Sequence, residues 1–487
     1  MIVDRPRVVF SALRGNSGKT FLTVGVGACL KHRGKAVSPF KKGPDYIDAA
    51  WLDMATGRPC YNLDLFLMGR EGILSSFSTR VQHADGALVE GNRGLYDGMD
   101  REGSYSTAEL AKLLQAPVIL VVDCSMATRT VAAMILGCQH FDPQVAIKGV
   151  ILNRIGGARH ESVIRSAIED RCGLPILGAV PRIQAGIFPE RHMGLVPPRE
   201  HPRAGQAVDE AARIVDGHVD VDRVWEIARG APAFEFDEQE SRQEEHHPFP
   251  SPSIKPKIGF IRDAAFWFYY PDNLEVLEKL GASLVACSAL NDRELPPVDA
   301  LYIGGGFPES HAAALTANGS FRTSLRNAAE AGLPVYAECG GLMYLGKELI
   351  VKENTYPMTG VFPLRFVLDR SPHGHGYTIL AVDAPNPYFS TGEILHGHEF
   401  HYSHIPDREK IGYTVFKVKR GLGIHGGRDG LLYKNVLATY SHVHASGAKS
   451  WAKALLDQAV YYQSKRLSEQ AMTADAVPVV TQISRMT

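Results

Sequence analysis

Short apolar runs alternate with amphipathic stretches along most of this chain. Six runs in the first half have the pattern of buried strands, at 7–12, 36–40, 86–90, 117–123, 147–153 and 176–180. Further runs in the second half include 257–261, 283–287, 300–303, 334–337 and 435–440. Strands that alternate with helical segments at this spacing predict parallel sheets covered by helices on both faces. The expected fold is therefore α/β, with two doubly wound, mostly parallel-sheet domains.

A polar stretch separates the two halves. Residues 231–256 are dominated by charged residues, Pro and Ser, with few apolar anchors, which is typical of a linker. We therefore expect a first domain over 1–230 and a second over 257–465. Residues 466–487 lack a clear period and are expected to form a frayed tail.

Composition and charge narrow the class of protein. The chain has 487 residues, of which 45% are hydrophobic, enough for more than one core. Its 52 Lys and Arg residues balance 53 Asp and Glu residues, so the charge does not indicate nucleic acid or an anionic membrane as a partner. No apolar run approaches the roughly 18–20 residues of a membrane span, and we expect no signal peptide. Seven scattered cysteines without a CxxC pair favour a reducing cytoplasm over a disulfide framework.

One cysteine lies in a segment with catalytic character. In AGLPVYAECGGLMYLG (331–346), Cys339 falls between a predicted buried strand and a predicted helix. Such a tight turn presents a nucleophile above a parallel sheet, and the adjacent glycines let other backbone pass close by. The helix N-terminus is expected to favour the thiolate. Considered alone, the position suits a small buried core cysteine equally well.

Two further segments favour a catalytic role. Three glycines at 304–306 follow a predicted strand, and their N–H groups suit an oxyanion hole, although an ordinary strand-to-helix turn also uses glycines. A strand-like run ends at Tyr440 and delivers His442, with His444 two residues later. A cysteine and a histidine on neighbouring strand ends can form a nucleophile–base pair.

In this order, GGGFPE (304–309), YAECGGLMYLG (336–346) and ATYSHVHAS (438–446) resemble the class I glutamine amidotransferase domain, in the branch fused to cobyrinate a,c-diamide synthases. The resemblance implies that Cys339 attacks the amide of glutamine and releases ammonia. It makes His442 the first candidate base and His444 the second. His444 occupies the place where the wider class usually carries a glutamate, so a third catalytic residue is not supplied locally. The expected oxyanion-hole donors are Gly305, Gly306 and Gly340.

The N-terminal segment VVFSALRGNSGKTFLTVG (8–25) has the pattern of a strand, a glycine-bearing turn and a helix. Such a loop surrounds phosphates with backbone N–H groups and adds a lysine charge and a threonine hydroxyl for magnesium. The full P-loop pattern is not met, because Leu13 holds the place of its first glycine. The candidate ATP-binding residues are Gly15, Ser17, Gly18, Lys19 and Thr20.

Carboxylates follow two of the predicted strands. Asp45 and Asp48 come after the run at 36–40, and Glu90 ends the run at 86–90. Such carboxylates beside a phosphate loop are natural ligands of Mg²⁺, although each alone could serve as a helix cap or a turn residue. The expected magnesium ligands are Thr20, Asp45 and Glu90.

The first half is similar to the same synthase family, whose ATP-binding domain belongs to a dethiobiotin-synthetase-like branch. The similar segments are PFKKGPDYID, NLDLF, EGNRGLYDG, LNRIGG, LGAVPRI and PERHMGL, so the resemblance covers about residue 7 to about residue 463. By this resemblance the substrate-side residues are Lys42, Tyr46, Asp48 and Asp97. Further cations that could meet a tetrapyrrole with many carboxylates, or be ordinary surface charge, are Lys41, Arg93, Arg191 and His192.

The resemblance implies a Mg²⁺-dependent ligase that uses ATP and glutamine to amidate the a and c acetate carboxylates of cobyrinate through an acyl phosphate. Hydrogenobyrinate or a sirohaem-type tetrapyrrole is the alternative substrate. The reason is that the two positions between Gly91 and Gly94, which include Arg93, are polar where the resemblance leads us to expect an apolar pair. A partition-type ATPase switch and a binding protein with inactive sites are alternatives from other classes. The balanced charge, Cys339 and Lys19 favour the enzyme, with small-molecule partners, no nucleic acid, no membrane and a cytoplasmic location. The oligomeric state stays open, a homodimer included.

Overall fold

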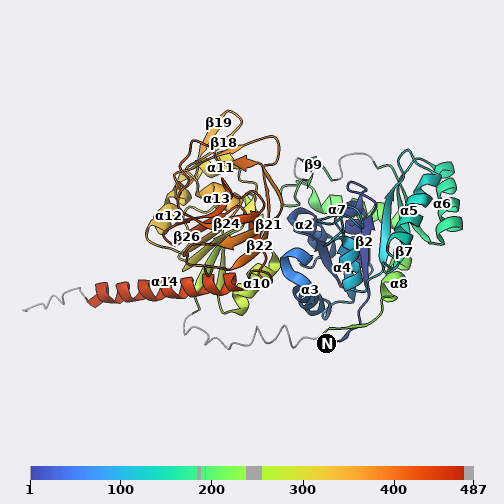
Figure 1. The fold of residues 1–487 in the computed structure, drawn as a ribbon, viewed down its shortest axis with the longest axis horizontal. Coiled ribbons are helices and arrows are strands. Elements are labelled where there is room, and N and C mark those ends of the chain that lie inside the picture. The colour runs from blue at the N-terminus through green and yellow to red at the C-terminus, as the bar shows by residue number, and fades with distance from the viewer. Residues whose placement is uncertain (1, 184–187, 192–193, 237–254, 476–487) are drawn as a thin grey trace, which may run out of the picture. The chain divides into compact units, whose positions relative to one another are not determined.

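The computed structural model describes residues 2–183, 188–191, 194–236 and 255–475 (Figure 1). The chain divides into two compact units, 1–247 and 248–487. The first unit includes the beginning of the segment that the sequence predicted as a linker, because β11 (Phe234–Glu235) pairs antiparallel with β1 (Ile2–Val3). Among the described residues, none of the helices is long and apolar enough to cross a membrane.

The first unit contains a seven-stranded sheet in which every pairing is parallel. In spatial order its strands are β4 (Tyr61–Leu63), β3 (Val37–Lys42), β5 (Gly86–Glu90), β2 (Arg7–Ala12), β6 (Val118–Asp123), β7 (Ile147–Ile155) and β8 (Ile176–Pro181). The six strands predicted from apolar runs are all present. Only β4 was missed, because three residues are too few to show a hydrophobic pattern.

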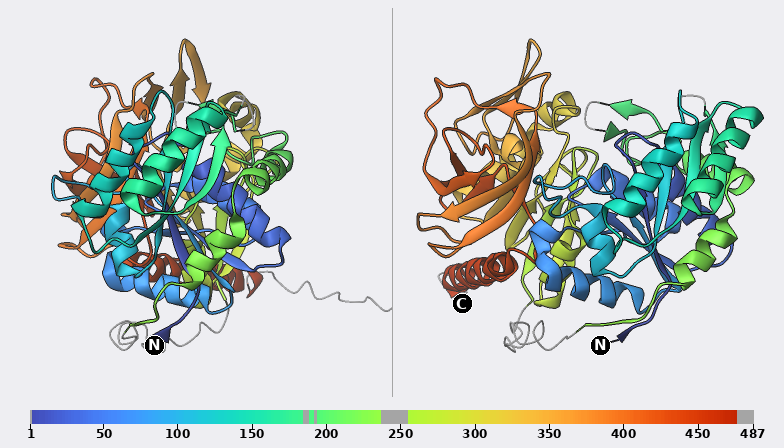
Figure 2. Two further views of the ribbon diagram at one scale, coloured as in Figure 1. Left: turned by 90° about the vertical axis from the view of Figure 1, so that its right-hand side faces the viewer. Right: turned by 45° about the vertical axis from the view of Figure 1, so that its right-hand side comes forward.

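Helices cover both faces of this sheet (Figure 2). They are α1 (Lys19–His32), α2 (Tyr46–Thr56), α3 (Leu65–Val81), α4 (Thr107–Leu113), α5 (Arg129–Phe141), α6 (Ala158–Cys172), α7 (Ala204–His218) and α8 (Val221–Arg229). Side chains directly after strands cap several of them: Asp45 accepts from Asp48 N at the start of α2, and Asp64 accepts from Phe66 N and Leu67 N at the start of α3. A short hairpin, β9 (Glu190–Arg191) and β10 (Gly194–Leu195), precedes α7.

The second unit contains a ten-stranded sheet that is parallel in one half and antiparallel in the other. The parallel half is the one that the sequence predicted: β14 (Ser283–Cys287), β12 (Lys257–Ile261), β15 (Ala300–Ile303), β17 (Val335–Glu338) and β26 (Val436–Thr439). The antiparallel half adds β25 (Arg428–Tyr433), β24 (Thr414–Arg420), β21 (Gly374–Val382), β22 (Ile394–His401) and β27 (His442–Val443). The predicted class of two mostly parallel α/β domains is confirmed.

Smaller elements surround this second sheet. One short ribbon pairs β13 (Phe266–Phe268) with β16 (Gly305–Gly306), and a four-stranded sheet has the order β19 (Asn354–Pro357), β18 (Glu348–Val351), β20 (Arg365–Leu368) and β23 (Ser403–His404). The helices are α10 (Pro271–Lys279), α11 (Ala312–Ala317), α12 (Gly319–Glu330), α13 (Gly340–Leu345) and α14 (Lys449–Asp475). Helix α14 continues past residue 466, where the sequence predicted a frayed tail, because good helix formers such as Glu, Gln, Ala and Met extend it without a breaker.

Two candidate active sites at strand ends

Cys339 lies in a strained turn between β17 and α13. Its backbone has φ 48° and ψ −100°, a conformation that costs a non-glycine residue about 1–3 kcal/mol and concentrates at functional sites. The turn is held by hydrogen bonds from Cys339 N to Thr439 O (2.8 Å) and from Met343 N to Cys339 O (3.1 Å). The side chain is 5% exposed. This is the strand–turn–helix geometry that the sequence predicted around the thiol.

The glycine segment after β15 touches this turn. A Cβ added to Gly340 would lie 3.1 Å from Gly306 N, and one added to Gly341 would lie 2.6 Å from Ile303 O. The close approach of the two backbones therefore requires glycine at position 341 and favours it at position 340. Gly305, Gly306 and Gly340 are thus neighbours beside the thiol, although they come from segments far apart in the chain.

His442 approaches the same place from β27. A Cβ added to Gly305 would lie 2.5 Å from His442 Cε1 and 3.2 Å from its Nε2, so the Nε2 edge of the ring faces the glycine segment. The opposite edge faces an acid: His442 Nδ1 is 3.3 Å from Glu338 Oε2. The imidazole is therefore held between the glycine segment and a carboxylate, which is the arrangement of a positioned base.

Glu338, the residue directly before Cys339, was not among the residues that the sequence singled out. Its side chain is 1% exposed and also accepts hydrogen bonds from Tyr302 Oη (3.1 Å) and Val443 N (3.2 Å). A charged residue at the end of the apolar strand PVYAE was the available signal, because a buried carboxylate requires partners.

His444 has a different environment. Its Nε2 lies 3.5 Å from Asp272 Oδ2, its ring packs 4.9 Å from Tyr270, and Ser446 N donates to its Nδ1. None of these contacts involves the glycine segment or Glu338. The two histidines that the sequence left as alternatives are therefore distinguished by their partners.

Burial raises the pKa of the Cys339 thiol, and the nearby Glu309 carboxylate acts in the same direction, while the Gly340 N–H opposes both. The helix N-terminus was expected to favour the thiolate, but desolvation outweighs it at this buried position. The resting sulfur is therefore protonated and requires a base before it can act as a nucleophile.

In the first unit, the loop before α1 has the backbone of a phosphate-binding turn. Gly18, the N-cap of α1, has φ 85°, and Asn16 has φ 56°. Asn153, at the end of β7, donates from Nδ2 to Ser17 O (2.9 Å), and a Cβ on Gly18 would lie 2.2 Å from the same nitrogen. The sequence did not identify Asn153 as the anchor of this loop. A Cβ on Gly15 would meet nothing within 4 Å, so close packing does not require glycine there.

Lys19 points toward the loop after β5. Its Nζ donates to Arg93 O (2.7 Å), where Arg93 has φ 49°. Burial, reinforced by the Lys41 charge, lowers the pKa of Lys19 to about 8, against the opposing pull of Glu90 and other carboxylates. The ammonium thus loses its proton more easily than an ordinary lysine does.

A buried network of charges lies beside Lys19. Lys41 Nζ is 2.9 Å from both Asp48 Oδ2 and Glu90 Oε1, and Thr20 Oγ1 donates to Glu90 Oε1 (2.7 Å). Burial alone would lower the pKa of Lys41, but Asp48 and Glu90 outweigh it and raise that pKa. Asp48 and Glu90, two of the three carboxylates that the sequence singled out, therefore share one buried ammonium.

Oxygen atoms for a hard cation remain in this network. Glu90 Oε2 is buried and makes no hydrogen bond within the described part of the chain. Burial and the neighbouring Asp48 carboxylate raise the pKa of Asp45 to about 7. The oxygens of Thr20, Asp45 and Glu90 are the ligand type that Mg²⁺ prefers. An added positive charge would give the buried Glu90 Oε2 a partner and would favour the ionised form of Asp45. The residues present therefore fit the ion that the sequence predicted.

The remaining substrate-side candidates differ in exposure. Lys42 and Tyr46 are buried, whereas Asp97 is exposed and accepts from Gly94 N (2.8 Å). Burial lowers the pKa of Lys42. Of the cations in PERHMGL, Arg191 belongs to β9, and His192 lies outside the described residues.

Comparisons with known proteins give the class first. Residues 257–450 match the CobB/CobQ-like glutamine amidotransferase domain, and residues 8–196 match the CobQ/CobB/MinD/ParA nucleotide binding domain. These matches fall on the two units that carry Cys339 and the phosphate loop. The protein is a glutamine-hydrolysing amidoligase with a nucleotide-binding domain.

Similar curated proteins narrow this class to one family. Each of three relatives has the name cobyrinate a,c-diamide synthase: one from Magnetococcus marinus is 44% identical over 92% of this chain and 96% of its own, one from Archaeoglobus fulgidus is 42% identical over 94% and 98%, and one from Methanosarcina acetivorans is 40% identical over 95% and 97%. The chain belongs to the cobyrinate a,c-diamide synthase family.

Proposed function

We propose that this enzyme amidates the a and c acetate carboxylates of cobyrinate, with ATP as the activating substrate and glutamine as the nitrogen source. The observation that carries the proposal is the contact of Gly305 with His442 and of Gly306 with Gly340, which gathers nucleophile, base and oxyanion donors in one unit. The phosphate loop and its buried carboxylates supply the activating site in the other unit. The relatives' name supports the choice of cobyrinate.

In the glutaminase site, His442 Nε2 takes the proton from Cys339 Sγ as the sulfur attacks the amide carbon of glutamine. The negative charge that develops on the amide oxygen is stabilised by N–H groups of Gly305, Gly306 and Gly340. The C–N bond then breaks, and the nitrogen leaves as ammonia after receiving the proton from His442. Water hydrolyses the glutamyl thioester and restores the thiol.

Glu338 completes this site as the partner of His442. Its carboxylate faces Nδ1, so it holds the ring with Nε2 toward the glycine segment and would stabilise the imidazolium that forms during attack. Tyr302 and Val443 in turn hold the carboxylate. In this proposal His442 is the base, and His444, paired with Asp272, supports the surrounding core.

In the activating site, N–H groups of the turn before α1 and the Lys19 ammonium bind the phosphates of ATP. Thr20, Asp45 and Glu90 would hold Mg²⁺, which when bound neutralises phosphate charge. A carboxylate oxygen of the tetrapyrrole attacks the γ-phosphorus and ADP leaves. Ammonia attacks the resulting acyl phosphate at carbon, and phosphate leaves. Activation is required because oxide is not a leaving group.

Lys42 is the residue best placed to meet a substrate anion. It ends β3 beside the network around Lys41 and is 6% exposed. Burial lowers the pKa of this ammonium against the opposing pull of Asp64, and an incoming carboxylate or phosphate would compensate the cost of burying the charge.

The test combines product analysis with two variants. The protein is incubated with ATP, glutamine and a panel of tetrapyrrole acids, and mass spectrometry counts the carboxylates converted to amides. We expect two conversions on cobyrinate. Cys339→Ala should lose glutamine-dependent activity but keep activity with high ammonium, whereas Lys19→Ala should lose both. Preferred amidation of hydrogenobyrinate or a sirohaem-type acid would correct the substrate, and glutamine use by Cys339→Ala would refute the nucleophile assignment.

A further inference from the structure

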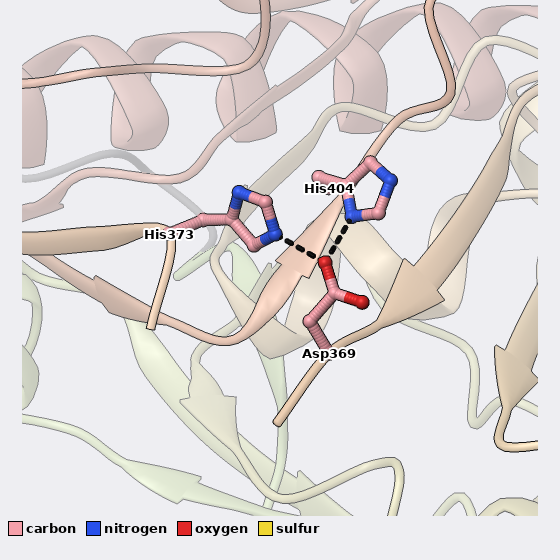
Figure 3. Close-up of side chains that lie close together, drawn as sticks. All are labelled: Asp369, His373 and His404. Carbon is pink, nitrogen blue, oxygen red and sulfur yellow. Dashed lines mark hydrogen bonds and ion pairs between the residues drawn. The ribbon is translucent and has the colours of Figure 1, made fainter. Parts of the chain in front are cut away.

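A second group of chemically reactive side chains lies outside both sites. Asp369, His373 and His404 point toward one another, and one ligand atom from each lies within 4.8 Å of the others (Figure 3). His373 Nε2 is 2.5 Å and His404 Nδ1 is 3.0 Å from the same carboxylate oxygen, Asp369 Oδ2. Nothing in the proposed amidation uses these residues.

The three side chains come from separate segments whose backbones are tied together. Asp369 directly follows β20, His373 directly precedes β21, and His404 belongs to β23, where it pairs with Val367. Hydrogen bonds join Asp369 N to Tyr402 O and His373 N to His401 O, both 2.9 Å. The cluster is therefore preorganised by sheet pairing, which binding sites on flexible loops lack.

The hydrogen bonds within the cluster do not account for all of its atoms. His404 Nδ1 is buried and, within the described residues, makes no hydrogen bond of acceptable geometry, although it is 3.0 Å from the carboxylate. The two imidazole rings lie 4.6 Å apart, tilted by 36°. Both ring nitrogens converge on the same carboxylate oxygen, but only His373 forms a hydrogen bond with it, so a ligand atom of His404 remains available to an ion.

We propose that Asp369, His373 and His404 bind a divalent transition-metal ion of the zinc type. Two imidazoles and one carboxylate are a common protein ligand set for such ions, with bond lengths of about 2.0–2.2 Å and water in the remaining position. The cluster also has a path for the ion and its water, because Asp369 and His373 are exposed.

A bound ion would connect the outer sheet to the glutaminase site. β22 continues through Phe400 and His401 into β23, and Phe400 O lies 3.9 Å from Cys339 Sγ. By holding His404 against Asp369 and His373, the ion would fix the segment that supplies this carbonyl. The site is therefore placed to stiffen the segment whose carbonyl lies beside the Cys339 sulfur.

The test measures Zn²⁺ binding by the full-length, chelator-treated protein with excess Mg²⁺ present to fill oxygen-ligand sites. Calorimetry should show one Zn²⁺ per chain more for the wild type than for His373→Ala or Asp369→Asn, or at least an approximately tenfold loss of affinity in each variant. His396→Ala, which removes another exposed histidine on β22, should bind as the wild type does.

Thermal unfolding distinguishes zinc binding by the cluster from a role in which its three side chains only hold the fold through contacts with one another. Zn²⁺ should raise the Tm of the wild type and of His396→Ala by linkage, and should raise the Tm of Asp369→Asn less or not at all. Asp369→Asn keeps an oxygen acceptor for the histidines, so it should unfold near the wild-type temperature without zinc. Equal Zn²⁺ stoichiometry and affinity in the wild type and the cluster variants would overturn the proposal.

Discussion

The Glu338 carboxylate is fully enclosed, and Tyr302, His442 and Val443 surround its oxygens. Glutamine at this position keeps an oxygen acceptor and nearly the same volume but removes the negative charge that stabilises a protonated imidazole. Catalysis should therefore suffer more than folding does.

We expect Glu338→Gln to lower kcat for glutamine hydrolysis by about 10²-fold or more, while ammonium-dependent amidation stays near the wild-type rate. Asp272→Asn is the matched control, because it neutralises the partner of His444 in the same way. Steady-state glutamate release measures both. A larger loss in Asp272→Asn would transfer the role of base to His444.

Two shifted pKa values in the activating site give a second prediction at individual side chains. Asp45 has its pKa raised to about 7, so below that pH it would be protonated and could not act as the proposed cation ligand. Lys19 has its pKa lowered to about 8, so above that pH it would lose the charge that is proposed to bind phosphate. The form with both charges is most populated between about pH 7 and about pH 8.

The pH profile of kcat/KM for ATP, measured with saturating ammonium, should therefore fall on both sides of this window. Asp45→Asn should remove the acidic limb, because the group that titrates there is gone, and should lower the maximum. An acidic limb that persists unchanged in Asp45→Asn would show that another group titrates.

Between elements, the phosphate loop depends on a neighbouring strand for its shape. Asn153 on β7 holds Ser17 O and occupies the space that a Cβ on Gly18 would need. Losing a buried hydrogen bond of this type costs about 1–3 kcal/mol when the carbonyl is left without a partner. Part of this free energy would be lost from the loop conformation that is proposed to bind the phosphates.

Asn153→Ala should raise KM for ATP by about tenfold with ammonium as the nitrogen source. Glutamine affinity should not change, since the substitution lies in the other unit. Gln144→Ala, an exposed residue just before the same strand, is the control. An unchanged KM for ATP in Asn153→Ala would mean that the loop keeps its shape without this anchor.

For the chain as a whole, the two proposed reactions are linked by ammonia, which one site would release and the other would consume. The nucleophile belongs to one compact unit and the phosphate loop to the other. If ammonia passes within a chain before water reaches the acyl phosphate, ammonia released by one chain cannot efficiently supply the amidation site of another.

We therefore expect that mixing full-length Cys339→Ala with full-length Lys19→Ala will not restore glutamine-dependent amidation when an enzymatic ammonia scavenger is present. Each variant has one intact site, so added ammonium at high concentration should restore product through Cys339→Ala. Simultaneous measurement of glutamate, ADP and amidated product distinguishes the cases. Full restoration despite the scavenger would contradict transfer within the chain.

Much of this architecture could be predicted from local sequence. Several strands of the two sheets, such as β6, β15 and β17, are buried along nearly their whole length, so they are short and largely apolar runs. The turns at Gly18 and Cys339 were recognisable because glycines mark places where backbone conformation or close approach is constrained. The strand-end position of the candidate residues followed from the rule for parallel sheets.

The partnerships between distant residues were not accessible in this way. Glu338 and His442 are 104 residues apart, Ser17 and Asn153 are 136 apart, and each pair meets only through sheet order. The sequence favoured His442 as the base without excluding His444, which lies two residues later. Because β27 ends at Val443, the two side chains meet different neighbours. Local order thus revealed where reactive groups would emerge, whereas the packing of strands from across the chain determined which groups pair, how deeply the thiol is buried and whether Asp369, His373 and His404 converge.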